Sequence, residues 1–128
     1  MMEMDESDEI VTVAGDDEGM VWAINTARQS LKQFLNAYFA PKPNQRSFLL
    51  KVVFEEQDEI EHIWLADLDL HSSSLTGMVA NEPGIRSISF MQRVTFEAKN
   101  ITDWMYCEDD CLIGAFTTRV LKKSARPN

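Results

Sequence analysis

Hydrophobic residues recur with a helical spacing in the first third of the chain. Between Asp16 and Tyr38 they return every three or four positions, which predicts one long amphipathic helix. Its apolar stripe comprises Val21, Ile24, Ala27, Leu31, Phe34, Leu35 and Tyr38, with Arg28 at the edge. Acids at positions 16–18 favour a helix start because the unpaired N–H groups there attract negative charge. Pro41 and Pro43 prevent the helix from continuing.

After the prolines the spacing changes to an alternation of apolar and polar residues, which is the period of a β-strand. Strands are predicted at Arg46–Glu56, at Ile60–Leu70 and at Leu75–Ala80. In the second strand, Trp64, Leu68 and the other even-numbered residues form a nearly all-apolar face, while the odd-numbered face changes from apolar to charged. Short polar turns separate the three strands, which predicts an antiparallel meander.

The last third of the chain is predicted to return to the sheet. Residues 85–91 are interpreted as a loop, and Gln92–Ala98 as a fourth strand. We expect a single helical turn within residues 100–106, with Trp104 in the core, and a final strand from Cys111 to Lys122.

This order of elements indicates an α+β fold: a strongly bent antiparallel sheet, or a small SH3-like open barrel, with one N-terminal amphipathic helix packed against it. The barrel alternative is an analogy, because a one-turn helix between the last two long strands is typical of SH3-like barrels. A length of 128 residues fits one domain. We expect an acidic, flexible leader at residues 1–18, a single domain at 19–123 and a frayed tail at 124–128.

The net charge of −9 at pH 7 comes mainly from the beginning of the chain. Residues 1–18 hold eight acids and no Lys or Arg, whereas the rest holds 13 acids and 12 bases. The nearly neutral remainder lacks the basic stripe of a nucleic-acid binder. The leader is interpreted as a solubilising segment, or as an arm that engages a basic partner. No run approaches the ~20 apolar residues of a membrane span, and the acidic start is unlike a signal peptide, so we expect a cytoplasmic protein without membrane contact.

Three short motifs occur together in the chain: W-L-x-D at Trp64–Asp67, G-x-x-A-N-x-P at Gly77–Pro83 and I-x-D-W-M-Y at Ile101–Tyr106. With the opening helix, they make residues 20–122 resemble the bacterial domain of unknown function 2314, the YegJ-like proteins. The resemblance implies a fold but no reaction, cofactor or substrate. One departure concerns the turn before the fourth strand, where the family commonly shows Gly-Asp and this chain has Met91-Gln92.

Two acids and a histidine, Asp67, Asp69 and His71, are spaced by two and would project from one face of a strand. Such a set can form a metal site, but neighbours about 7 Å apart on a flat strand do not share an ion without a bulge. His62, beside Trp64, is interpreted as a packed histidine rather than a general base. We therefore assign no metal, cofactor or catalytic residue. A small metal-dependent hydrolase that uses these acids and histidines stays as an alternative.

The two cysteines, Cys107 and Cys111, are too few for a disulfide scaffold, and a zinc site takes four ligands while the two histidines lie far off in the sequence. In a cytoplasmic protein we expect reduced, structural cysteines. A hairpin disulfide or a redox pair is the alternative.

Polar residues at two predicted loops form the candidate binding site. In a structural interpretation, Asn81 fixes the turn after the third strand, and Asp103 caps a helix or pairs with an arginine such as Arg119. In a functional interpretation, both loops border one peptide-binding groove with Trp64 or Trp104 as its aromatic floor. The candidate residues are Trp64, Asp67, Asn81, Glu82, Asp103 and Trp104.

The absence of a dense polar cluster favours a non-enzymatic protein-binding module. The expected partner is another protein, not nucleic acid or a membrane. One alternative is an immunity-type protein that neutralises a basic toxin or partner through its acidic surface. The others are the metal-dependent hydrolase and a structural domain completed by another chain.

Overall fold

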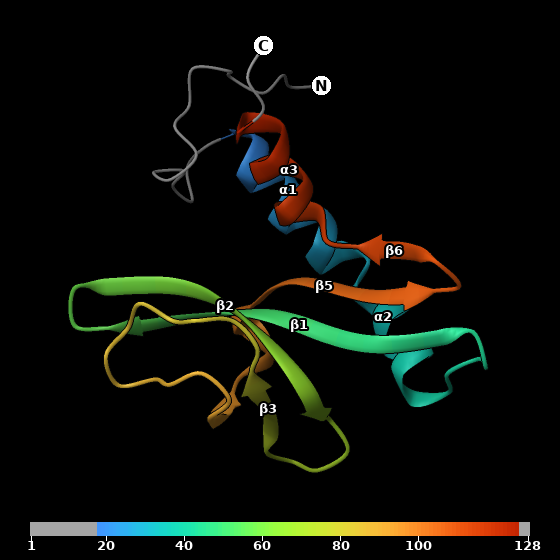
Figure 1. Cartoon of the computed structure of the whole chain (residues 1–128), viewed down its shortest axis with the longest axis horizontal. Helices are drawn as coiled ribbons and strands as arrows, with labels where there is room; N and C mark the ends of the chain where they lie inside the picture. Colours follow the sequence, from blue (N-terminus) through green and yellow to red (C-terminus); the bar gives the residue numbers. More distant parts are fainter. Residues whose placement is uncertain (1–17, 126–128) are drawn as a thin grey trace.

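The computed structural model describes residues 18–125 of the chain. The predicted acidic leader, apart from Glu18, lies outside the described residues, as do the last three residues of the predicted tail. The elements are α1 (Glu18–Gln29), α2 (Leu31–Phe39), β1 (Gln45–Glu56), β2 (Glu59–Asp69), β3 (Leu75–Val79), β4 (Arg93–Phe96), the 3₁₀ helix η2 (Ala98–Asn100), β5 (Ile101–Glu108), β6 (Cys111–Gly114) and α3 (Phe116–Ala125). Figure 1 shows α1 and α3 side by side, rising from the sheet.

The described strands form one antiparallel sheet in the order β4-β3-β2-β1-β5-β6. In a flat sheet β4 and β5 would lie about 19 Å apart, at about 4.8 Å per strand. Only residues 97–100 join them, and a 3₁₀ helix rises only about 2 Å per residue. The sheet must therefore curl until β4 approaches the start of β5. No strand pairing joins β4 to β5 within the described residues, so the sheet stays open. The predicted α+β fold with a strongly bent antiparallel sheet is confirmed.

The predicted single helix is divided at Ser30. The Ser30 hydroxyl donates to the Thr26 carbonyl oxygen at 2.7 Å. A serine hydroxyl bonded to the carbonyl four residues earlier favours a bend in a helix. The helix is interrupted here and α2 begins at Leu31, while Ala27 of α1 and Phe34 of α2 pack in the same core.

The buried face of α1 also differs from the predicted stripe. Met20 and Ala23 are buried, whereas Val21, which the spacing placed in the stripe, is 38% exposed. The reason is the packing partner, because Met20 and Ala23 form a small cluster with Val120 of α3. The spacing alone allowed either face, and the helix that selects one of them follows almost a hundred residues later in the sequence.

In α2, Phe34 is fully buried, as predicted, and joins α2 to the sheet. Its ring centre lies 5.7 Å from that of Phe48 on β1, and 5.9 Å and 6.4 Å from those of Trp104 and Tyr106 on β5. Aromatic pairs at these separations add to the free energy gained from burial. The predicted core position of Trp104 is confirmed.

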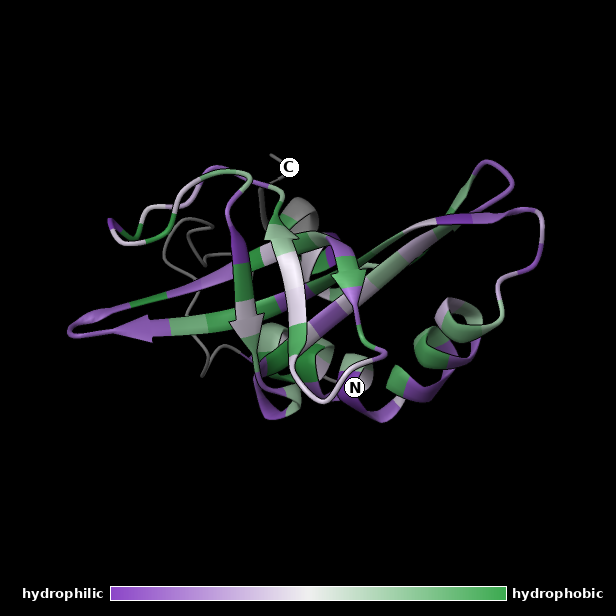
Figure 2. Ribbon diagram, turned by 90° about the horizontal axis from the view of Figure 1, so that it is seen from below, coloured by the Kyte–Doolittle hydropathy of each residue, from purple (hydrophilic) through white to green (hydrophobic). Residues whose placement is uncertain are grey.

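The two strand faces of β1 follow the predicted alternation, but those of β2 do not. In β2, Ile63 and Leu65 are buried and Trp64 lies on the opposite face. A bulge at Asp67, with φ of +48°, then shifts the alternation so that Leu68 returns to the core. The prediction that Trp64 and Leu68 share a face was wrong, because it assumed an unbroken strand. Figure 2 shows apolar and polar positions alternating along the strands.

The C-terminal third differs most from the prediction. The residues assigned to a helical turn form strand β5, and the one-turn helix is Ala98–Asn100 instead. The predicted last strand is split into β6 and α3 at Gly114 and Ala115, whose φ angles are +89° and +58°. Two successive positive φ angles reverse the chain, and the Ala115 N–H then donates to the Trp104 carbonyl oxygen at 2.7 Å.

Gly114 is expected to tolerate no side chain. A Cβ there would lie 2.6 Å from Cε3 of Trp104, at a φ of +89°. We expect Gly114→Ala to lower the free energy of unfolding by about 3 kcal/mol or more, from strain and overpacking together. Urea unfolding measures this change. The matched control is Gly84→Ala, where the nearest atom is the flexible Glu61 carboxylate at 3.3 Å, and where we expect a loss within about 1 kcal/mol. Equal losses in the two variants would contradict the close approach at Trp104.

Candidate functional site

A row of three side chains crosses the sheet on the face opposite the aromatic core. Lys51 of β1 pairs with Trp64 of β2 on one side and with Asp103 of β5 on the other. Directly paired residues project from the same face of a sheet. Lys51 is 7% exposed and Asp103 is fully buried. Trp64 and Asp103 were candidates from the sequence, but Lys51 was not, because its partners come from distant parts of the chain.

The Lys51 ammonium group has two kinds of partner. Nζ donates to Oγ1 of Thr117 at 2.8 Å and lies 5.1 Å from the ring centre of Trp64. A cation over an aromatic face is attracted by the ring quadrupole. Burial lowers the pKa of Lys51, and the nearby negative charge of Asp103 acts in the opposite direction.

Asp103 caps helix α3. Its Oδ1 accepts the N–H of Phe116 at 3.1 Å and that of Trp104 at 2.8 Å, and its Oδ2 accepts the N–H of Thr117 at 2.7 Å and the Thr117 hydroxyl. A carboxylate at a helix N-terminus satisfies unpaired donors and complements the helix dipole. Asp103 thus caps a helix, as the structural interpretation expected, although that helix was not predicted. Arg119 donates to backbone carbonyl groups instead of pairing with Asp103.

His62 lies on the same sheet face as Trp64 and contacts β5. Its Nδ1 is 3.1 Å from Oγ1 of Thr102. Partial burial of the ring lowers the pKa of His62, the Lys51 charge acts in the same direction, and Glu61 opposes both. Thr102 is the hydrogen-bonding partner of this ring among the described residues, and His62 as a whole is exposed.

Asp67 forms an ion pair that closes the bulge in β2. Its Oδ2 lies 2.6 Å from the guanidinium of Arg93 on β4, which also donates to the Asp67 carbonyl oxygen and to Thr76. Both charged side chains are substantially exposed, so the ion pair itself contributes little to stability. The contact instead holds β4 against the irregular end of β2.

The two acids and the histidine of the predicted metal alternative do not converge. Asp67 faces Arg93, and Asp69 accepts the backbone N–H of His71 at 3.1 Å. The His71 ring packs against Tyr38 and another aromatic ring of α2. Within residues 18–125, no group of three or more His, Cys, Asp or Glu is placed to hold a metal ion.

The remaining candidate residues lie in different surroundings. Asn81 accepts the backbone N–H of Trp64 at 2.7 Å and so extends the β2–β3 pairing. Glu82 is exposed in the loop after β3. Trp104 lies on the core face, where its Nε1 donates to the Ala27 carbonyl oxygen at 3.0 Å. Trp64 and Trp104 therefore occupy opposite faces of the sheet and do not form one aromatic floor.

Cys107 and Cys111 do not face one another. Cys107 pairs with Leu112, and Cys111 pairs with Glu108. Neighbouring pairs of an antiparallel ladder project to opposite faces, so the two thiols point away from each other. Both are free cysteines.

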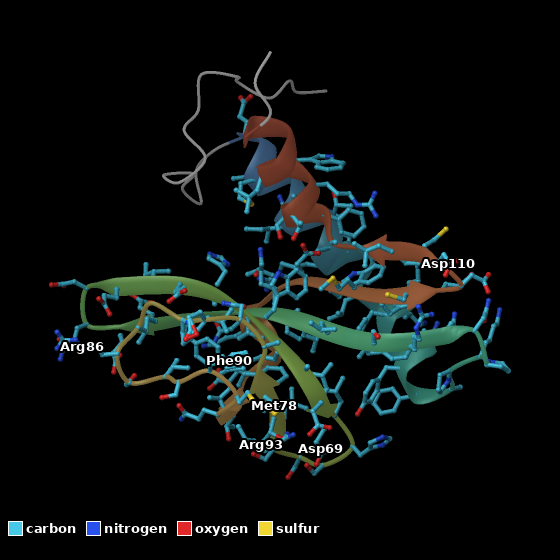
Figure 3. All side chains as sticks on the ribbon, in the orientation of Figure 1. Asp69, Met78, Arg86, Phe90, Arg93 and Asp110 are labelled. Carbon is cyan, nitrogen blue, oxygen red and sulfur yellow. The ribbon has the colours of Figure 1, made fainter. Side chains whose placement is uncertain are left out.

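A tight turn precedes β4, at the position where the sequence departs from the family resemblance. Gln92 N–H donates to the Ser89 carbonyl oxygen at 3.0 Å, and Met91 has a φ of +72°, the geometry of a type II turn. Its two central residues, Phe90 and Met91, are 50% and 58% exposed. Figure 3 labels Phe90 on this turn. Met91 stands at the position of this turn where the positive φ would favour Gly.

Comparisons with known proteins place the chain in a family. The family DUF2314, described as an uncharacterized protein conserved in bacteria, matches residues 17–127. The chain belongs to this family. The resemblance to DUF2314 inferred from the three motifs is confirmed. The uncharacterized protein YegJ of Escherichia coli is 30% identical over 112 residues, which cover 87% of this chain and 72% of YegJ.

A second relative is a putative ankyrin repeat protein of Neisseria meningitidis serogroup B. It is 27% identical over 115 residues, which cover 83% of this chain. The match spans 46% of the Neisseria protein, less than half of its length. No solved structure matches this DUF2314 chain. Between residues 18 and 125 no helix is long and apolar enough to cross a bilayer.

Removal of the Asp103 carboxylate tests the coupling between Asp103 and Lys51 in the row of three side chains. We expect Asp103→Ala to lower the free energy of unfolding by about 3–5 kcal/mol, because it uncaps α3 and leaves Lys51 buried without its counter-charge. Adding Lys51→Met should restore about 1–2 kcal/mol of this loss. Denaturant unfolding of both variants measures the two effects. If the second substitution makes the loss larger, Lys51 is not coupled to Asp103 in this way.

In the Phe90–Met91 turn we expect one substitution to raise stability instead of lowering it. Met91→Gly should raise the free energy of unfolding by about 0.5–1 kcal/mol, because glycine adopts a positive φ without the Cβ strain. The control is Phe90→Gly in the same turn, where φ is not positive and glycine should lower stability. Thermal and urea unfolding distinguish the two. A loss of stability in Met91→Gly would show that the side chain contributes packing that outweighs the strain.

Proposed function

We propose that this DUF2314 domain is a non-enzymatic protein-binding module whose main contact is the Phe90–Met91 turn. The observation that carries the proposal is the exposure of two large apolar side chains at adjacent positions of one tight turn. One of them holds a left-handed conformation, which costs an L-residue about 1–2 kcal/mol. Strained backbone and exposed apolar side chains concentrate where proteins contact other molecules.

The turn is held rigidly by the neighbouring strand. Met91 N–H donates to the Val79 carbonyl oxygen at 2.9 Å, and Val79 N–H donates to the Gln92 carbonyl oxygen at 2.8 Å. The Gln92 side chain also accepts the N–H of Ser89 at 2.8 Å. A rigid turn loses little conformational entropy when it binds, and phenylalanine and methionine are enriched at protein interfaces. The turn therefore has the properties of a preformed anchor.

Three charged residues with potential chemistry support a binding role because they already serve the fold. Asp103 caps α3, Lys51 bonds Thr117, and Asp67 pairs with Arg93. A general acid or base needs to reach a substrate, and these groups are engaged with the protein itself.

The Neisseria relative adds independent support. Its name describes a putative ankyrin repeat protein, and the match to this chain spans less than half of it. Ankyrin repeats stack into extended binding surfaces. A segment similar to this chain in a protein of that name supports a role in protein binding.

An acidic arm favours a basic partner, in line with an immunity-type protein. The β1–β2 hairpin carries Glu55, Glu56, Asp58, Glu59 and Glu61, and no Lys or Arg between them. The arm projects beyond the rest of the sheet in Figures 1 and 2. Charges of one sign on a projecting element steer a partner of the opposite sign during association.

Affinity capture with paired variants tests the proposal. The tagged full chain is incubated with a lysate of the source bacterium at low and at high salt. We expect the unaltered protein to retain a protein partner in stoichiometric amount, and Phe90→Ser to lose it, because the anchor would be removed. The partner is quantified by mass spectrometry.

The control is Leu112→Ser, which makes the same kind of change at a residue of β6 that is 46% exposed. It should retain the partner, while circular dichroism shows both variants folded. Absence of a stoichiometric partner at both salt concentrations, or its retention by Phe90→Ser, would count decisively against the proposal.

A further inference from the structure

One edge of β1 is free along part of its length. β1 pairs with β2 up to the hairpin, but it pairs with β5 only as far as Val52, which lies opposite Ile101. Residues 53–56 have no strand on their outer side within the described part of the chain. In a strand every second residue directs its N–H and C=O to the same side. The outer edge of this segment therefore presents unpaired backbone donors and acceptors, the template that a further strand requires.

The connection that leads into β5 lies beside this edge but does not pair with it. Because η2 turns the chain into β5 at Ile101, no β5 residue lies opposite residues 53–56. A groove of about 310 Å³ remains between the edge and the end of β4. It is lined by Val52, Val53, Phe54, Glu55, Thr95, Phe96, Glu97 and Asn100. In Figure 1 the β1–β2 arm extends well past the beginning of β5.

The groove has an apolar floor and an acidic rim. Phe96 is buried and Phe54 is partly buried in the main core, whereas Glu55 and Glu97 are exposed. Lys99 lies 3.5 Å from Glu97, but both side chains are largely exposed. An ion pair of this kind is worth little, so Glu97 can exchange Lys99 for another cation. An occupant that matches the groove has basic side chains toward the rim and small apolar side chains toward the floor.

We infer that this groove receives an extended, basic segment of the protein partner, which adds as a strand to the outer edge of β1 between residues 53 and 56. Backbone hydrogen bonds to the free edge supply affinity, and the acidic rim supplies selectivity for Lys and Arg. The inference rests on the proposed protein-binding function and names the chemistry of the bound segment. It uses residues other than the Phe90–Met91 turn.

The probe is the capped peptide acetyl-Lys-Val-Lys-Thr-Lys-Val-Lys-amide, titrated into the full, isotope-labelled chain and followed by NMR. We expect the backbone amides of residues 53–56 and 95–97 to shift, and the outward amides of residues 53–56 to gain protection from hydrogen exchange. A peptide with the same side chains can also bind through charge alone, without joining the sheet. Backbone methylation separates these two modes.

Two methylated peptides are compared, one N-methylated at its odd positions and one at its even positions. In a strand these two sets point to opposite sides. We expect one set to weaken binding about tenfold or more, because it removes the hydrogen bonds to β1, and the other set to bind like the parent. Equal binding of both methylated peptides, or no binding of the parent peptide, would overturn the inference.

Charge variants of the protein give a second readout. Glu55→Lys combined with Glu97→Lys should weaken binding of the parent peptide about tenfold, since both substitutions lie at the rim. The matched control is Asp110→Lys made together with Asp109→Lys in the β5–β6 turn. Figure 3 labels Asp110 at the tip of that hairpin. An equal loss in the control would mean that only net charge attracts the peptide, and would overturn strand addition.

Failure of this inference and failure of the proposed function give different results. If Phe90→Ser loses a captured partner while the peptide does not bind, the turn contact stands and strand addition is overturned. If the peptide binds at residues 53–56 but Phe90→Ser retains its partner, the turn contact is wrong and strand addition is supported.

Discussion

The short connection between β4 and β5 is the constraint on which the rest of this structure depends. Residues 97–100 join β4 to β5, although β3, β2 and β1 lie between these two strands in the sheet. A 3₁₀ turn spans only a small part of the distance that would separate β4 from β5 in a flat sheet. The sheet curls as a result and encloses the core. The same turn brings the chain into β5 opposite Val52, so that the end of β1 keeps a free edge. The fold and the groove have a common cause.

The Asp103 carboxylate joins the other half of the molecule to this curled sheet. It lies on β5 and caps α3, and α3 in turn packs against α1. Lys51 approaches the same cap through the hydroxyl of Thr117. A buried carboxylate and a buried ammonium group are costly to desolvate, and they persist where each is hydrogen-bonded in place. Asp103, which the sequence offered as a candidate binding residue, therefore serves to hold α3 on the sheet.

The Phe90–Met91 turn contradicts local preference twice. It exposes two large apolar side chains and places one of them at a positive φ. Positions that contradict local preference without a gain in stability are where function is expected. The free edge of β1 is a second such position, because natural proteins usually cover or shorten an unpaired edge. These two surface features of the DUF2314 chain carry the two proposals.

Sequence by itself determined the α+β class, the three-strand meander, the burial of Trp104 and the family, because apolar spacing and local motifs reflect properties of neighbouring residues. The alternating faces of β1 followed for the same reason. Only the tertiary structure decided the break at Ser30, the bulge at Asp67, the division of the last strand and the row formed by Trp64, Lys51 and Asp103. Apart from the break at Ser30, which a local hydrogen bond to Thr26 accompanies, each of these depends on a contact with a distant segment. Alternation specifies two faces for a strand or helix, and only the partner that packs against it selects which face is buried.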